Sequence, residues 1–187
     1  MNIMKRFLVC GIFLIILSSC GGVNMSITAE TSQNTTSKSE SIKDEKDYQD
    51  YSESDLDNLD NFYLKDGTYC IYLYSTTCPF CSGIKQDIFK YIDKSKLNPN
   101  LIKMFIFNIG SNSTSQGTIN REKFKYHEDD DAIRDSLIEE MLEGNVSSLS
   151  DTYFFGTPSL YFIRDKKLYD YKLGKDVSSF LVSNNNL

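Results

Sequence analysis

Cys78 and Cys81 are the residues of this chain whose types and spacing most directly indicate chemistry. Pro79 and Phe80 lie between them, so the segment is Cys-Pro-Phe-Cys. If the segment opens a helix, the second thiol lies nearly one turn beyond the first and can reach back to its sulfur. Such a pair can form a disulfide and break it again by thiol–disulfide exchange. The spacing therefore indicates redox chemistry carried by two sulfur atoms.

The flanking sequence predicts the elements that position this pair. Residues 69–74 form an apolar run with aromatic and β-branched side chains, which is typical of a buried strand. Residues 75–77 turn the chain. Apolar residues then recur at helical spacing: Ile84, Ile88, Tyr91 and Ile92. Cys78 is thus expected where a helix begins, and there the unpaired N–H groups and the helix dipole favour the nucleophilic thiolate.

Two motifs together resemble the thioredoxin superfamily. The first is the strand, the Cys-Pro-Phe-Cys segment and the helix that follows it. The second is Phe-Phe-Gly-Thr-Pro-Ser at 154–159, followed by the strand-like residues 160–163, which resembles the cis-proline loop of that family. The two motifs in this order are far more specific than either alone. The resemblance covers residues 55–185.

The resemblance implies a role for each motif. Cys78 would form the mixed disulfide with a partner, and the more buried Cys81 would resolve it. The loop, with a cis peptide bond before its proline, would dock an extended substrate as an added strand. The residues implied to contact substrate are Thr157, Pro158, Pro79 and Phe80. Many family members also have a buried acid six residues before the first cysteine. Tyr72 stands at that position here, so proton transfer from the buried thiol would take another route.

The first residues resemble a bacterial lipoprotein signal peptide. Two basic residues precede an apolar run at 7–17, which is shorter than the about 20 residues that a transmembrane helix needs. Leu-Ser-Ser-Cys-Gly at 17–21 resembles a lipobox. We therefore expect a signal peptide at 1–19 and lipidation of Cys20, which would anchor the protein at the extracytoplasmic face of the bacterial cell membrane. The alternative is an ordinary secretory signal in which Cys20 is incidental.

The rest of the chain divides by composition. Residues 20–47 almost lack large apolar side chains, so they bury too little surface to offset the entropy of ordering and are predicted to be a disordered tether. Residues 48–187 suit one thioredoxin-like domain. The formal net charge of −6 disfavours nucleic acid as a direct partner.

The predicted fold is α/β, a mixed sheet flanked by helices on both faces. The pattern favours a helix over 53–66 before the first strand and a parallel strand over 101–109. After the cis-proline loop, residues 160–164 and 167–173 predict a hairpin, and a final helix follows.

An insertion before the cis-proline loop departs from the smallest members of the family. It falls at about 110–151 and opens with a polar loop. Apolar residues at helical spacing then predict a helix over 129–143, and a second inserted helix remains open. Insertions at this place in the family often shape substrate choice, and a purely structural role in covering the sheet is the alternative.

The cysteine and histidine content argues against a metal site or cofactor. A structural zinc site needs four ligands, and the chain has one Cys pair and a single histidine, His127, in a polar stretch that predicts a solvated surface residue. A c-type haem would need a histidine at position 82, which is a serine. Cys70 lies within the first strand and is expected to be a buried, inert thiol.

These patterns predict an extracytoplasmic thiol–disulfide oxidoreductase. Its partners would be exported proteins or peptides with thiols or disulfides, a redox partner protein, and the membrane through the lipid on Cys20. The direction of electron flow stays open among oxidant, reductant and isomerase. The alternative is a thioredoxin-like accessory protein that binds peptides or bacteriocins during export without turnover.

Overall fold

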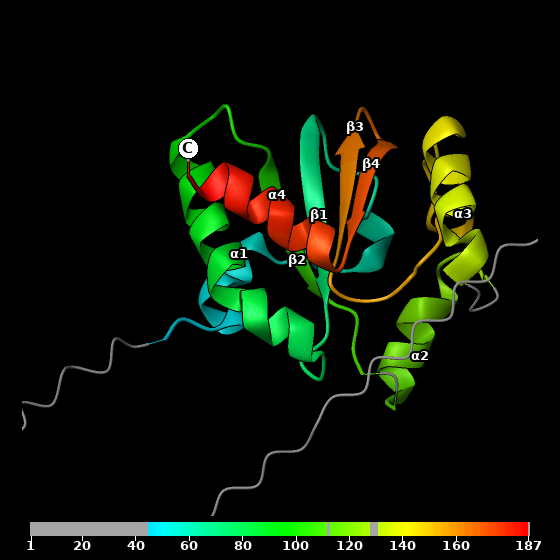
Figure 1. Cartoon of the computed structure of the whole chain (residues 1–187), viewed down its shortest axis with the longest axis horizontal. Coiled ribbons are helices and arrows are strands. Elements are labelled where there is room, and N and C mark those ends of the chain that lie inside the picture. The colour runs from blue at the N-terminus through cyan, green and yellow to red at the C-terminus, as the bar shows by residue number, and fades with distance from the viewer. Residues whose placement is uncertain (1–44, 112, 128–130, 187) are drawn as a thin grey trace, which may run out of the picture. The chain divides into compact units, whose positions relative to one another are not determined.

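The computed structural model describes residues 45–111, 113–127 and 131–186 (Figure 1). The predicted signal peptide, Cys20 and the predicted tether as far as residue 44 lie outside the described residues. Within the described ranges, no helix combines the length and apolar character needed to cross a membrane.

A mixed four-stranded sheet forms the centre of the domain. Its strands are β1 (Thr68–Tyr74), β2 (Lys103–Asn108), β3 (Ser159–Arg164) and β4 (Lys167–Leu173), in the order β2-β1-β3-β4. β1 and β2 are parallel, whereas β3 is antiparallel to both β1 and β4. The parallel pair, the hairpin and the mixed sheet are as the sequence predicts.

Two aromatic-rich cores cover the two faces of this sheet. Because successive strand residues point to opposite faces, β1 contributes to both cores. Cys70, Tyr72 and Tyr74 pack on the side of α1 (Pro79–Leu97) and α4 (Lys175–Asn185). The alternate β1 residues pack on the other side, with α3 (Asp131–Glu143) next to β4 in Figure 1.

The predicted helix over 53–66 is wrong. Two short 3-10 helices, Tyr48–Ser54 and Leu59–Asn61, stand in this region. Between them the chain is extended, and the Leu56 N–H donates to the carbonyl of Ile106 in β2 at 2.8 Å. The side chain of Asn58 accepts from two backbone N–H groups and starts the second 3-10 turn. The apolar residues of the segment are nevertheless buried as their spacing suggested: Leu56, Leu59, Phe62 and Tyr63.

The insertion holds two helices. α3 matches the predicted helix, and α2 (Ser115–Glu122) is the second helix that the sequence left open. The Thr114 side chain caps α2 by accepting from the N–H of Gly117 at 3.1 Å. A short loop joins the end of β2 to α2, so the insertion begins at the end of the sheet where the parallel strand β1 also leads into the Cys segment.

Candidate redox-active site

Cys78 occupies the N-cap of α1. The turn after β1 places it there, with the Cys78 N–H donating to the carbonyl of Ser75 at 3.1 Å. The Cys78 Sγ accepts from the backbone N–H of Cys81 at 3.1 Å, and Pro79 fills the first helical position. An N–H donor and the positive end of a 19-residue helix therefore face this sulfur.

Cys78 and Cys81 form a disulfide, with their Cα atoms 5.3 Å apart. The two sulfurs differ in access, since Cys81 is 1% exposed and Cys78 is half-buried. A thiolate of another protein can therefore approach Cys78 and not Cys81. Next to Cys78, Pro79 is exposed and Phe80 is 51% exposed.

The loop before β3 faces this disulfide. The Thr157–Pro158 peptide bond is cis, and the Thr157 carbonyl oxygen lies 3.5 Å from the Cys78 Sγ. Pro158 is buried, and its carbonyl accepts from the N–H of Gly174 at 2.9 Å, whereas Thr157 is half-buried. The structure thus brings together the two motifs, which are far apart in the sequence, and leaves backbone at Thr157 beside the more accessible sulfur.

The cluster of buried side chains that holds Cys81, beneath the active-site helix, is rich in tyrosine. Tyr72 is fully buried in the same cluster as Cys81, and Tyr48 stacks on Tyr74 with ring centroids 3.7 Å apart. Burial, and secondarily the neighbouring Tyr48, raises the pKa of Tyr72 well above its usual range. Neither the Tyr72 nor the Tyr48 hydroxyl makes a hydrogen bond of ordinary geometry within the described residues. The position where the resemblance implies an acid therefore holds a neutral hydroxyl.

Cys70 stands apart from the redox pair. It is a free cysteine with no exposed surface, and burial raises the pKa of its thiol. A neutral, inaccessible thiol is a poor nucleophile. Within the part of the chain that the structure describes, no group of three or more His, Cys, Asp or Glu residues is arranged to hold a metal ion.

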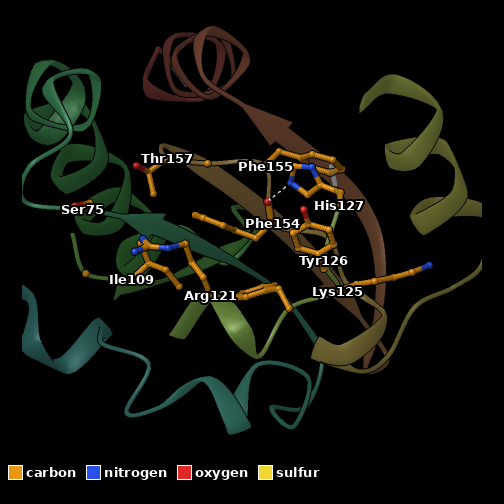
Figure 2. A pocket seen from close by; sticks show the side chains of 12 residues that line it. Ser75, Ile109, Arg121, Lys125, Tyr126, His127, Phe154, Phe155 and Thr157 are labelled. Atoms are coloured by element: carbon orange, nitrogen blue, oxygen red, sulfur yellow. Dashed lines mark hydrogen bonds between the residues drawn. The ribbon is translucent and has the colours of Figure 1, made fainter. Parts of the chain in front are cut away.

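A pocket of about 600 Å³ adjoins Thr157 (Figure 2). The ends of β1 and β2, the helix α2, the segment after it and the cis-proline loop all contribute to its walls. The lining residues are Ser75, Ile109, Gly110, Arg121, Phe124, Lys125, Tyr126, His127, Phe154, Phe155, Gly156 and Thr157.

The prediction that His127 is a solvated surface residue is wrong. Its ring is half-buried in the pocket wall, 4.8 Å from the Phe155 ring between centroids. Its Nε2 donates to the Phe154 carbonyl at 2.7 Å (Figure 2). The polar sequence around His127 gave no sign of this contact, because the contact joins the insertion to the cis-proline loop. Phe124, whose ring lies against that of Phe154 in the loop, was missed for the same reason, and Arg121 was missed because its guanidinium is placed by a contact with the Ser111 carbonyl.

Comparison with known proteins gives similarity to solved structures alone. No family model matches the chain, and no curated protein matches it. The oxidized mitochondrial thioredoxin 3 from Saccharomyces cerevisiae is 12% identical, with a TM-score of 0.39 over 71% of this chain and 93% of that chain. Thioredoxin f2 from Chlamydomonas reinhardtii is 11% identical, with a TM-score of 0.38 over 69% and 91%. A thiol-disulfide isomerase from Corynebacterium glutamicum is 11% identical, with a TM-score of 0.31 over 71% and 89%.

TM-scores this low carry no weight for activity. The thioredoxin-like α/β fold is visible in the chain itself, in the strand order β2-β1-β3-β4 with helices on both faces. This fold holds a disulfide-forming cysteine pair with two intervening residues at the N-terminus of α1.

Proposed function

We propose that this protein is an extracytoplasmic thiol–disulfide oxidoreductase, anchored by a lipid on Cys20, that exchanges disulfides with exported proteins. The observation that carries the redox part is the position of the Cys78 Sγ. This sulfur is half-exposed, faces the Cys81 N–H at 3.1 Å and lies 3.5 Å from the Thr157 carbonyl oxygen. The membrane part is supported by the lipobox-like sequence that ends in Cys20-Gly21.

The oxidised protein would react in two exchanges. A substrate thiolate attacks the Cys78 Sγ, the bond to Cys81 breaks, and Cys81 leaves as a thiolate that takes a proton. A second substrate thiolate then attacks the substrate sulfur of the mixed disulfide, and Cys78 leaves as a thiolate. The substrate loses two electrons and the cysteine pair gains them. Reduction of a substrate disulfide is the same sequence reversed, with Cys81 displacing the substrate from Cys78.

The surroundings of Cys78 would favour its role in both directions. The Cys81 N–H and the N-terminus of α1 stabilise negative charge on the Cys78 sulfur, whether it attacks or leaves. The half-buried backbone at Thr157 would hold the substrate chain in an extended form by main-chain hydrogen bonds, as in strand addition. Phe80 would add apolar contact next to the reacting sulfur, because half of its surface is exposed.

Turnover with a disulfide substrate tests the redox part. The reduced full-length protein should accelerate the reduction of insulin disulfides, or the oxidised protein should accelerate the oxidation of a reduced, unfolded disulfide protein. Cys78→Ser should abolish either activity, and Cys70→Ala should retain it. No acceleration in either assay by the unsubstituted protein would overturn the proposal. The anchor is tested separately: Cys20→Ser should move the protein from the membrane fraction to the soluble fraction and remove fatty-acid labelling.

The 600 Å³ pocket next to Thr157 also suits a second candidate function, peptide holding without turnover in an accessory protein for peptide or bacteriocin export. The discriminating measurement is peptide affinity in Cys78→Ser, Cys81→Ser. Unchanged affinity without any redox turnover of the unsubstituted protein would favour the binding module. Turnover that depends on Cys78 favours the enzyme.

A further inference from the structure

The helix α2 is fixed closely to the end of β2. Asn120, which is 6% exposed, donates from Nδ2 to the Ile109 carbonyl at 3.1 Å. Gly110 has a φ of +88°, and a Cβ built on it would lie 2.8 Å from the Cα of Gly117. A Cβ on Gly117 would lie 2.0 Å from the carbonyl oxygen of Ser111. The backbone after β2 and the backbone of α2 are therefore in contact at Gly110 and Gly117, where neither residue has room for a side chain. This contact sets the position of α2.

This contact places the guanidinium of Arg121 in the pocket wall. Arg121 Nη2 donates to the Ser111 carbonyl at 3.0 Å, and it lies 2.9 Å from where a Gly117 Cβ would stand. Figure 2 shows the side chain extending toward the Ser75 side of the pocket. A guanidinium has five N–H donors. One is used by Ser111, and Arg121 forms no ion pair with a carboxylate of the described residues.

Lys125, the lysine of the pocket lining, is held differently. Its Nζ pairs with Glu140 of α3 at 2.9 Å and lies 4.5 Å from the centroid of the Tyr153 ring. Figure 2 shows its side chain extending away from the Arg121 guanidinium. The charge of Lys125 is therefore balanced by Glu140, whereas the Arg121 guanidinium keeps N–H donors that no carboxylate of the described residues accepts.

Apolar rings line the pocket beside this cation. Phe124 is buried and its ring lies 5.5 Å from the Phe154 ring between centroids, while Tyr126 is largely exposed at the pocket wall. Such a lining suits the aliphatic or aromatic part of a ligand. The chain as a whole is acidic, with a formal net charge of −6, and Arg121 is the cation of the pocket lining that has no carboxylate partner among the described residues.

We propose that this pocket is a specificity subsite that binds a carboxylate of the peptide docked on Thr157, with Arg121 as the group that receives it. The inference rests on the proposed function, because it takes the peptide to be a thiol- or disulfide-bearing substrate. The pocket includes both Thr157 and Arg121, so the carboxylate belongs to a residue near the reacting cysteine of the substrate. A guanidinium binds a carboxylate with two parallel N–H donors, which gives orientation as well as affinity. The carboxylate is that of an Asp or Glu side chain or of a C-terminus.

A panel of activated peptides tests the subsite. Each short peptide carries one cysteine in a disulfide with 2-thiopyridine, which has no carboxylate and whose release as 2-thiopyridone is followed by absorbance. The peptides differ by Glu or Gln at each position flanking the cysteine, and each has a free or an amidated C-terminus. With the reduced full-length protein, we expect the best Glu or free-terminus peptide to react about fivefold faster than its neutral match. The position or terminus that gives the effect identifies the source of the carboxylate.

Substitutions separate the subsite from long-range charge. In Arg121→Gln, the charged and neutral peptides should react at the same rate, and in Arg121→Glu the neutral peptide should react faster than the charged one. Lys123→Gln is the matched control, because it removes one positive charge at a position two residues from Arg121. The Lys123 side chain pairs with Asp60 and does not line the pocket. This variant should keep the discrimination.

The outcomes distinguish this inference from the proposed function. If all peptides react with Cys78 of the unsubstituted protein at equal rates, the subsite is overturned and the proposed oxidoreductase function is not. Equal loss of discrimination in Arg121→Gln and Lys123→Gln would also overturn the subsite, because the effect would then be one of net charge. Failure of every peptide to react at Cys78 would overturn the proposed function itself.

Discussion

At the scale of single residues, Cys78 and Cys81 differ in environment despite their identical chemistry. Cys78 faces a backbone donor and is accessible, whereas Cys81 is almost fully buried among aromatic and aliphatic side chains. A sulfur that is reachable and stabilised as an anion is suited to exchange with a partner. A buried sulfur is suited to internal exchange with its neighbour. The proposed division of roles therefore rests on burial and one hydrogen bond.

The tyrosines of β1 allow a prediction about stability. The Tyr69 hydroxyl donates to the Phe62 carbonyl at 2.9 Å in a buried site, whereas the Tyr72 hydroxyl on the opposite face makes no hydrogen bond of ordinary geometry within the described part of the chain. Tyr69→Phe should therefore lower the free energy of unfolding by about 1 kcal/mol, and Tyr72→Phe should raise it by about 1 kcal/mol. Urea denaturation of the oxidised proteins measures both. A loss in Tyr72→Phe equal to that in Tyr69→Phe would contradict the prediction.

At the scale of elements, the contact between α2 and the end of β2 is the part of the insertion that positions the proposed subsite. This contact combines the close approach of two glycines, Gly110 and Gly117, with the hydrogen bond from Asn120 to the Ile109 carbonyl. Because the atoms that a Gly117 Cβ would meet include backbone, the neighbouring chain has to move to admit one. The position of Arg121 would move with it.

Two glycine-to-alanine substitutions are predicted to have opposite effects. Gly117→Ala should lower the free energy of unfolding by about 1–3 kcal/mol, because its Cβ overlaps the Ser111 carbonyl. Gly83→Ala should raise it by about 0.5–1 kcal/mol, because Gly83 lies inside α1 with open space around its Cβ position. Thermal or urea unfolding of both variants is the measurement. A neutral Gly117→Ala would show that α2 is not held by this contact.

Comparison of the helices and strands with the sequence shows which parts of the fold local patterns predict and which depend on tertiary contacts. β1, α1, the hairpin and α3 have local apolar periodicity, and the structure has them where that periodicity indicates. The segment 53–66 has helical spacing too, but its Leu56 N–H pairs with β2, a tertiary contact that local pattern cannot reveal. The Cys pair and the cis-proline loop were found as motifs. The pocket wall was not, because it forms where α2, His127 and the loop meet through contacts distant in sequence.

At the scale of the whole molecule, the cores on both sheet faces are unusually rich in buried tyrosine, and this predicts alkaline sensitivity. Burial raises the pKa of Tyr48 and of Tyr69 to about 12 each, against about 10 in an unfolded chain. Between about pH 10 and 12 the unfolded chain loses these protons first, so the folded state binds more protons and the free energy of unfolding falls as pH rises. Below about pH 10 these tyrosines are protonated in both the folded and the unfolded state, so they do not make the free energy of unfolding depend on pH.

Urea denaturation of the oxidised protein from pH 8 to about pH 11.5 measures this dependence. Tyr48→Phe should flatten the alkaline decline, because one of the groups that causes it is removed. A stability that stays constant across the window, or a Tyr48→Phe profile as steep as that of the unsubstituted protein, would contradict the prediction.

The central claim is that Cys78, docked beside Thr157, is the sulfur that exchanges with other proteins. The most direct measurement is covalent trapping by full-length Cys81→Ser and Cys78→Ser proteins with a disulfide-bearing peptide, followed by mapping of the adduct. The account predicts that Cys81→Ser accumulates a mixed disulfide through Cys78, since the buried resolving thiol is gone, and that Cys78→Ser forms none. Equal trapping by the two variants, or an adduct on Cys81, would contradict it.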